Sequence, residues 1–298
     1  MTVYPFMRYK WYFIALVGVV TLFALISILV FGLRLGIEFN GGVRVEVKLE
    51  RPATVTQVRE AVSAVGVGDS VVQPVGDDGF VITASELSDA QYDELIATLA
   101  EDFGAEQAAA GMERVGPSFG AESGQKALIA VLFAIAVIVL YITWRFEYKF
   151  ALPAIVALVH DVALTLGVYA VTGRLVTAAT VAAVLTILGY SINDTIIVFD
   201  RIRENQILMK KESYASMVDL SIRQTLARSI NTALTTLMPI GTILLLGGAT
   251  LKDFAFALFI GIAAGGYSSM FVASPILTLW KEREPRFRKR AAAEKAAR

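Results

Sequence analysis

A few ionisable and polar side chains stand inside long apolar stretches of the sequence, where they could do chemistry that exposed groups cannot. They are His160 and Asp161 in one stretch, Asp194 in a second, and Arg228 and Asn231 in a third. A carboxylate at the centre of a bilayer costs about 2.5–3.5 kcal/mol on insertion scales, so such residues face a bundle interior or water and usually have partners. Adjacent helical residues point about 100° apart, so His160 and Asp161 need not share one partner.

The depth of these residues indicates which of them could meet. Asp194 lies six residues before Asp200, where its apolar stretch ends, and is about 9 Å deep at about 1.5 Å per residue. Arg228 lies five residues after Arg223, about 7 Å deep. Consecutive spans run antiparallel, so an Asp194–Arg228 pair is geometrically plausible, and Asn231 shares the face of Arg228. The pair could lock two helices, or Asp194 could take up and release protons. The residues alone leave both readings open.

No motif of enzyme chemistry accompanies these residues. The chain has no cysteine and one histidine, which excludes disulfides, thiolate metal sites and cysteine nucleophiles. It also lacks the P-loop pattern G-x-x-x-x-G-K-[ST] and the zinc-protease pattern H-E-x-x-H. We therefore expect no enzyme, no metal site and no cofactor.

The elements that must position these residues are six apolar runs, each long enough to cross a hydrocarbon core of about 30 Å as a helix. The chain is 56% hydrophobic, too apolar for an ordinary soluble domain. We predict a multi-pass α-helical membrane protein with transmembrane helices over residues 11–33, 127–144, 150–172, 176–199, 229–248 and 254–279. The predicted domains are 1–35 (cytoplasmic N-terminus and first helix), 36–124 (extracytoplasmic domain), 125–280 (helices two to six) and 281–298 (basic cytoplasmic tail).

The distribution of charge predicts how the chain is oriented. Residues 36–124 hold 16 Asp/Glu and only 5 Lys/Arg. Lys and Arg instead gather before the first span, between spans two and three, between spans four and five, and after span six. By the positive-inside rule these regions and both termini are cytoplasmic. The basic tail is expected to contact anionic membrane lipids rather than nucleic acid.

Residues 36–124 show the alternating patterns of a small α+β domain. Strands are predicted over 43–49, 70–75, 80–85 and 112–115, and helices over 54–66 and 88–104. Val43, Val45, Val47 and Leu49 alternate with polar residues, as in a half-buried strand. The order β-α-β-β-α-β predicts a ferredoxin-like fold between the first and second transmembrane helices.

Two glycine-containing segments join this domain to the membrane. They are "GIEFNGG" (36–42) and "VGPSFGAESG" (115–124), which contain Gly36, Gly41, Gly42, Gly116 and Pro117. Glycine permits backbone conformations and close approaches that other residues resist, and proline stiffens its neighbourhood. Each segment could be an ordinary turn or a hinge that absorbs a large change of dihedral angles.

The stretch "GYSINDTIIVFDRIREN" (189–205) resembles the fourth-span signature of the SecF family, membrane subunits of the bacterial Sec protein-export machinery. The segments "RSINTALTTL" (228–237), "HDV" (160–162), "VGPSFG" (115–120) and "GIEFNGG" (36–42) support the resemblance. The usual form of the last segment has Asp and Thr where this chain has Glu38 and Asn40. The resemblance covers nearly the whole chain.

The resemblance implies a relative of the proton-driven RND superfamily, located in the bacterial inner membrane. Such a subunit pairs with SecD, works with the SecYEG channel on a translocating preprotein, and draws on the proton-motive force. YajC and YidC are further candidate partners. By motif match, Asp194 and Arg228 correspond to residues implicated in proton passage, and Asn231 and the adjacent His160 and Asp161 are weaker candidates for the same relay.

Two other functions stay open at this point. One is an RND-type, proton-coupled transporter of a small molecule or lipid, which would need a substrate cavity. The other is a structural subunit without a proton role, in which Asp194 only locks helices together.

Overall fold

The structure is a computed structural model that describes residues 5–68, 70–76, 78–105, 111–210, 212–288 and 290. Six helical segments are long and apolar enough to cross a membrane, which confirms the predicted number of spans. They comprise η1 (Phe6–Tyr9) with α1 (Lys10–Phe31), then α5 (Pro117–Arg145), α6 (Tyr148–Thr172), α7 (Ala178–Leu208), α8 (Tyr214–Leu246), and finally α9 (Ala249–Ser268) with the π-helical turn η3 (Ser269–Ala273) and α10 (Ser274–Glu282).

Two of these helices begin well before the apolar run that predicted them. Helix α5 starts at Pro117, so residues 117–124, which the sequence analysis assigned to the domain 36–124, form the first turns of this helix. Helix α8 starts at Tyr214, where the Ser213 hydroxyl accepts a hydrogen bond from the backbone of Ser216. Hydropathy marks only the part of a helix that meets hydrocarbon, whereas capping residues decide where the helix begins.

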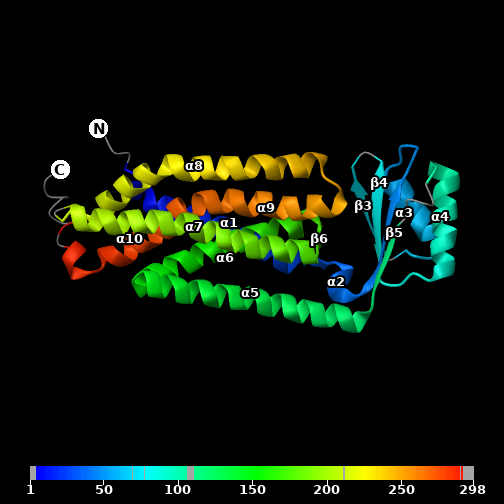
Figure 1. The fold of residues 1–298 in the computed structure, drawn as a ribbon, viewed down its shortest axis with the longest axis horizontal. Helices are drawn as coiled ribbons and strands as arrows, with labels where there is room; N and C mark the ends of the chain where they lie inside the picture. The colour runs from blue at the N-terminus through cyan, green and yellow to red at the C-terminus, as the bar shows by residue number, and fades with distance from the viewer. Residues whose placement is uncertain are drawn as a thin grey trace.

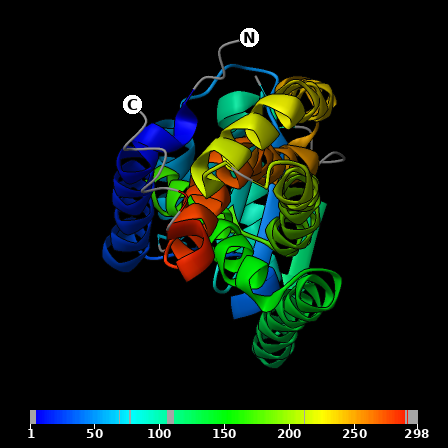
Figure 2. The same ribbon diagram turned by 90° about the vertical axis from the view of Figure 1, so that its left-hand side faces the viewer.

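The long helices form a bundle with the α+β unit at one end (Figure 1). Helices α7 and α9 pack extensively on each other, α8 packs on both, and α1 packs mainly on α6. Seen from the end, α5 lies at the edge of the bundle (Figure 2). The bundle core contains the aromatic side chains of Phe150, Phe199 and Tyr214, each 1% exposed or less.

The α+β unit has the element order that the sequence predicts. Its elements are β2 (Gly42–Lys48), α3 (Val55–Ala64), β3 (Ser70–Val75), β4 (Gly79–Ala84), α4 (Asp89–Phe103) and β5 (Gly111–Val115). The strands pair antiparallel in the order β3-β4-β2-β5. Helices α3 and α4 cover the sheet face that points away from the bundle (Figure 1).

Alternation and capping explain these elements locally. The alternating apolar residues of β2 are buried on one face with those of α3 and α4, as the pattern predicts. Thr54 and Ser88 cap the two helices in reciprocal capping boxes with Gln57 and Gln91. Gly104 ends α4 in the left-handed conformation, with φ of +68°. Each cap satisfies backbone groups that a helix end leaves unpaired.

A short parallel pairing that the sequence did not predict joins two links at the outer end of the bundle. Strand β1 (Arg34–Leu35), just after α1, pairs with β6 (Leu175–Val176), between α6 and α7. The short helix α2 (Ile37–Asn40) follows β1 and packs on α5. The chain therefore enters the α+β unit from a position fixed by backbone hydrogen bonds.

Candidate functional site: buried carboxylates of the bundle

Asp194 projects from α7 toward α8 and is 7% exposed. Its Oδ1 atom accepts a hydrogen bond of 2.6 Å from the Ser229 hydroxyl. Its Oδ2 atom is buried and has no hydrogen-bond partner among the described residues. The next residue, Thr195, lies 2.9 Å from Ser269 of η3, hydroxyl to hydroxyl. One carboxylate oxygen is thus held, and the other keeps free lone pairs.

Asp161 is a second buried carboxylate, on α6, and is 0% exposed. Its Oδ2 atom accepts two hydrogen bonds, 2.6 Å from Ser191 of α7 and 2.8 Å from Ser268 of α9. Its Oδ1 atom, like Oδ2 of Asp194, has no partner among the described residues. Asp161 therefore joins three helices through hydroxyl groups alone.

His160 contacts different residues from its neighbour Asp161, as their angular separation predicts. Its Nδ1 atom is 2.7 Å from the Thr21 hydroxyl of α1, and its Nε2 atom is 2.7 Å from the Tyr267 hydroxyl of α9. One ring nitrogen of a neutral imidazole donates and the other accepts. The histidine can therefore satisfy both contacts without a charge.

Arg228 and Asn231 are not part of this buried group, although the Arg228 charge is close enough to act on the Asp194 carboxylate. Both are exposed on the outer side of α8. No ion pair joins Arg228 to Asp194 within the described part of the chain; Ser229, the residue next to Arg228, bonds the carboxylate instead. The partner of Asp194 does come from the helix that the sequence indicated, α8, but it is a hydroxyl group and not the guanidinium group.

The serine partners carry only a weak signal in the sequence. Hydroxyl residues in helices commonly bond the carbonyl one turn back, as Thr165 does to the Asp161 carbonyl at 2.7 Å. Ser191 and Ser229 were distinguishable only by their closeness in sequence to Asp194 and Arg228. Ser268 and Ser269 follow Tyr267 in a run of three hydroxyl residues, which could have drawn attention to them.

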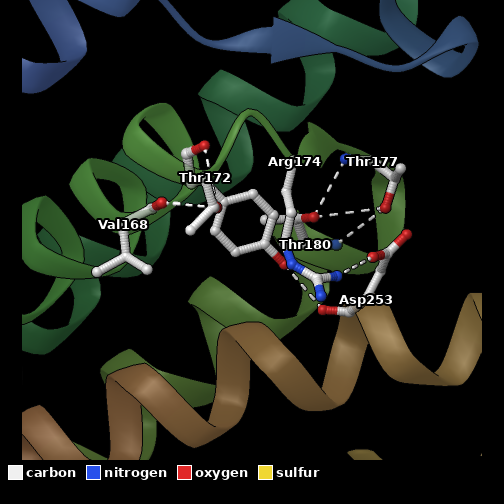
Figure 3. A network of polar contacts seen from close by, with 7 residues as sticks. Val168, Thr172, Arg174, Thr177, Thr180 and Asp253 are labelled. Carbon is white, nitrogen blue, oxygen red and sulfur yellow. Dashed lines mark hydrogen bonds and ion pairs between the residues drawn. The ribbon is translucent and has the colours of Figure 1, made fainter. Parts of the chain in front are cut away.

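A second polar network fixes the outer ends of the helices that carry the acids. Arg174, after α6, forms a 3.0 Å ion pair with Asp253 of α9 and lies 4.1 Å over the Phe256 ring. Figure 3 shows the Arg174 guanidinium group pointing to the Asp253 carboxylate, beside the Thr177–Thr180 capping box that begins α7. This network ties α6, α7 and α9 together at the end nearest the α+β unit.

The two glycine joints pack directly against each other. Gly41 has φ of +76°, and a Cβ atom there would lie 2.8 Å from the Pro117 Cα atom. Gly42 has φ of +129°, and a Cβ atom there would lie 2.5 Å from the Ala84 carbonyl oxygen. Gly36 donates a 2.9 Å backbone hydrogen bond to Val176. Gly41 and Gly42 therefore require glycine, whereas Gly36 contributes a backbone hydrogen bond.

At Gly116 an added Cβ atom would meet nothing within 4 Å, so no contact requires glycine there. Gly116 directly precedes Pro117, the first residue of α5. Whether any of these positions acts as a hinge stays a prediction.

The chemistry open to this site is proton exchange. Within the described ranges no group of three or more His, Asp or Glu side chains could hold a metal ion. Residues 116–120 fit the spacing G-x-S-x-G of a serine nucleophile. His160 is occupied by Thr21 and Tyr267, so Ser118 has no histidine base. What remains are two buried carboxylates, each with one free oxygen.

These features define a multi-pass membrane protein whose helix bundle encloses carboxylates bonded by hydroxyl groups. Two family models match it: the C-terminal part of the SecD/SecF protein-export membrane proteins over residues 95–283, and the SecD/SecF GG motif over residues 26–53. The chain belongs to the SecD/SecF family. The second match contains the glycine joint at 36–42, so the family resemblance seen in the sequence is confirmed.

Relatives in other bacteria extend over almost the whole chain. It is 41% identical to the protein translocase subunit SecF of Desulfurispirillum indicum, covering 96% of this chain and 95% of that protein. It is 40% identical to the protein translocase subunit SecF of Magnetococcus marinus, covering 92% of this chain and 89% of that protein. A relative named protein translocase subunit SecDF, from Thermus thermophilus, is 40% identical over 85% of this chain, which corresponds to 35% of that longer protein.

Solved structures agree in fold. The crystal structure of Thermus thermophilus SecDF, described as a translocon-associated membrane protein, superposes with a TM-score of 0.87 at 38% identity. It covers 95% of this chain, whereas this chain spans 39% of that one. A crystal structure of SecDF in a super-membrane-facing form superposes with a TM-score of 0.73 at 37% identity. The match covers 99% of this chain and 40% of that one.

Proposed function

We propose that this protein is an accessory subunit of the Sec translocon that pairs with SecD and uses the proton-motive force to promote preprotein translocation. Two observations together carry the proposal. Relatives covered almost end to end bear the name protein translocase subunit, and the bundle encloses carboxylates with free oxygens. SecYEG and the translocating preprotein are the further partners proposed, with YajC and YidC as candidates; the energy source is the proton gradient, without a cofactor.

We further propose that the protein lies in the bacterial inner membrane with both termini in the cytoplasm and with the α+β unit, a ferredoxin-like domain, outside. The order β-α-β-β-α-β and the antiparallel sheet support the ferredoxin-like assignment. The Lys and Arg residues flanking the spans at the opposite end of the bundle support the orientation.

In the proposed cycle Asp194 alternates between an ionised and a protonated state. An ionised Asp194 attracts the nearby Arg228 cation, whereas a neutral one does not. The 2.6 Å bond from Ser229 holds one oxygen while the other is free to take the proton. A change of charge at this point biases the bundle between two packings, which the glycine joints transmit to the α+β unit.

The outer faces of α7 and α8 support pairing with SecD. Small and polar residues of α7 point outward at helical spacing: Ala182, Thr186, Gly189 and Asn193. On α8 the exposed polar residues Arg228, Asn231 and Thr235 follow the same spacing. Polar side chains facing lipid are costly, and small residues allow close helix packing. A second membrane protein is the expected cover for this face.

The proton role is tested by preprotein export into inverted membrane vesicles containing Asp194→Asn. We expect export to lose its dependence on the proton gradient, because an amide cannot exchange a proton. Asp200→Asn, at the exposed cytoplasmic end of the same helix, is the matched control and keeps the dependence. Full gradient dependence in Asp194→Asn would refute the relay. Loss of folded protein, measured by melting, would instead favour a packing lock.

The pairing is tested with a photo-crosslinking amino acid in place of Asn193, which is exposed on α7. We expect a crosslink to SecD in native membranes. Leu29 of α1, 83% exposed on another side of the bundle, is the control position and should give lipid adducts. SecD crosslinks from Leu29 but not from Asn193 would contradict the assigned face.

The transporter alternative has one observation in its favour. A cleft of about 1220 Å³ lies between the sheet and the outer end of the bundle, with Arg44, Arg174 and Asp253 among its lining residues. Gentle purification separates the two functions, because capture of a small ligand favours transport, and capture of SecD with translocon components favours export.

A further inference from the structure

Three consecutive hydroxyl residues bond His160, Asp161 and Thr195, the residue next to Asp194, inside the bundle. They are Tyr267, Ser268 and Ser269, which we call the hydroxyl triplet. Tyr267 and Ser268 end α9, and Ser269 begins the π-helical turn η3. From α9 and η3, these adjacent residues reach both Asp161, through Ser268, and Thr195, the neighbour of Asp194, through Ser269.

Each hydroxyl of the triplet has a different partner. Tyr267 lies 2.7 Å from His160 Nε2, and Ser268 donates to Asp161 Oδ2 at 2.8 Å. Ser269 lies 2.9 Å from the hydroxyl of Thr195, the residue that follows Asp194 in α7. Adjacent residues of a helix point about 100° apart, so one turn of α9 can contact α6 and α7 together. The triplet is therefore a physical connection between two carboxylates on different helices.

The backbone at the triplet has a geometry that can change. Residues 269–273 form a π-helical turn, a rare distortion that often marks functional sites in α-helices. The Ser274 hydroxyl donates to the Ser269 carbonyl five residues back, at 2.8 Å, whereas an ordinary α-helical residue reaches four residues back. A return to α geometry would rotate Ser269 relative to Ser268.

Ser268 also has a second acceptor within reach. Its hydroxyl is 3.4 Å from the Gly265 carbonyl, in addition to its 2.8 Å bond to Asp161. When Asp161 is ionised, Ser268 donates to the carboxylate. When Asp161 holds a proton, the carboxyl O–H can donate to Ser268, which then turns its own proton to Gly265. The only species added is the proton on Asp161, and no other bond is formed or broken.

We propose that the hydroxyl triplet couples the protonation of Asp161 to that of Asp194, with Ser268 and Ser269 as positioning residues. The inference rests on the proposed function and adds to it the residues that connect the two carboxylates. The groups that face Asp161 are His160 on its own helix, Ser191 on α7, and Tyr267 and Ser268 on α9. Those that face Asp194 are Ser229 and Arg228 on α8, Tyr190 on its own helix, and Ser269.

The coupling is measured by infrared spectroscopy of the purified full-length protein in lipid, following the carbonyl stretch of each protonated carboxyl group during a pH titration. Asp161→Asn and Asp194→Asn assign the two bands. We expect Asp161→Asn to move the titration midpoint of Asp194 by about 1 pH unit, or about tenfold in proton affinity. In Ser268→Ala and Ser269→Ala backgrounds the same substitution should move it much less.

Thr165→Ala is the matched control. It removes a hydroxyl that is equally buried and bonds only the Asp161 carbonyl, so it should leave the coupling unchanged. Melting curves show whether each variant is folded, and serine to alanine removes a single oxygen atom. An undiminished shift in both serine variants would overturn the inference, as would an equal loss of coupling in Thr165→Ala.

Export assays separate this inference from the proposed function. If Asp194→Asn retains gradient-dependent export, the proposed proton role fails, while the spectroscopic coupling is judged on its own. If Asp194→Asn abolishes that dependence and the serine variants change neither the coupling nor export, the coupling role alone fails.

Discussion

Asp161 and Asp194 are both buried carboxylates, but the protein encloses them to different degrees. Asp161 is fully enclosed by α6, α7 and α9, whereas Asp194 is 7% exposed and lies on the side of the bundle that faces Arg228. Both are held by neutral hydroxyl donors, which stabilise an ionised oxygen less than a charged partner does. Asp194 is therefore better placed to exchange protons with a path along the outer face, and Asp161 can respond only through its neighbours.

At Gly41 the backbone conformation itself sets a requirement that can be tested. Gly41→Ala places a Cβ atom 2.8 Å from the Pro117 Cα atom at φ of +76°, a conformation that costs a non-glycine residue about 1–3 kcal/mol. We expect a lower melting temperature in detergent and weaker export. Gly116→Ala, where a Cβ atom meets nothing within 4 Å, should leave both within error. Equal melting temperatures for the two variants would show that the close packing of Gly41 on Pro117 does not stabilise the protein.

The sequence located the ionisable residues of the site but not their partners. Asp161, Asp194 and His160 could be found because a charge inside an apolar run is costly and therefore conspicuous. Ser229 could not, because a hydroxyl group in a helix can bond its own backbone and leaves no periodic pattern. The exposure of Arg228 also depends on how α8 rolls against α7, which tertiary packing decides.

At the scale of elements, local sequence patterns predicted the helices and strands of the α+β unit well. For the membrane helices they predicted the number but not where each helix begins. Alternation in β2 and the caps at Thr54 and Ser88 act over a few residues, so the sequence shows them directly. The β1–β6 pairing joins Arg34 to Leu175, far apart in the chain, and two-residue strands carry no period. The π-helical turn is likewise set by packing around Ser269 rather than by residue type.

The turn between α5 and α6 gives a pH-dependent prediction for the end of the bundle opposite the α+β unit. Lys281 of α10 is buried and donates a 2.7 Å hydrogen bond to Glu147. This bond and the lysine charge hold the pKa of Glu147 below its usual value of 4.5. A carboxyl with a lowered folded-state pKa adds stability above its unfolded pKa and loses it as pH falls through the folded value.

Glu147→Gln should therefore lower the melting temperature at pH 7 but not at a pH well below 4.5. The Glu147 side chain is 61% exposed, so solvent screening limits the effect to less than about 1 kcal/mol. The measurement compares the two proteins across this pH range. A melting difference that stays constant with pH would show that the loss comes from packing and not from the charge.

On the scale of the whole molecule, charge divides the protein into two ends. The α+β unit and the Arg174–Asp253 network lie at one end (Figure 1), and η1 and α10 lie at the other. At that second end, ion pairs join Lys10 to Glu282 and Lys149 to Glu284, so α1 and α6 are held to the end of α10 and to the residues just after it. Ion pairs thus hold the helices together at both ends of the bundle. The packing can therefore change in the middle, where the buried carboxylates lie, without separation of the helices.

This division predicts which end each reagent can reach in a living membrane. The chain has no cysteine, so single cysteines can be introduced without a background. Asp89, 81% exposed at the start of α4, and Glu204, 55% exposed near the end of α7, are suitable positions. A membrane-impermeant maleimide should label Asp89→Cys in intact spheroplasts, and Glu204→Cys only after the membrane is permeabilised, because the proposed topology places the positive end in the cytoplasm. The reverse pattern would invert the topology and place the α+β unit where it could not act on an emerging polypeptide.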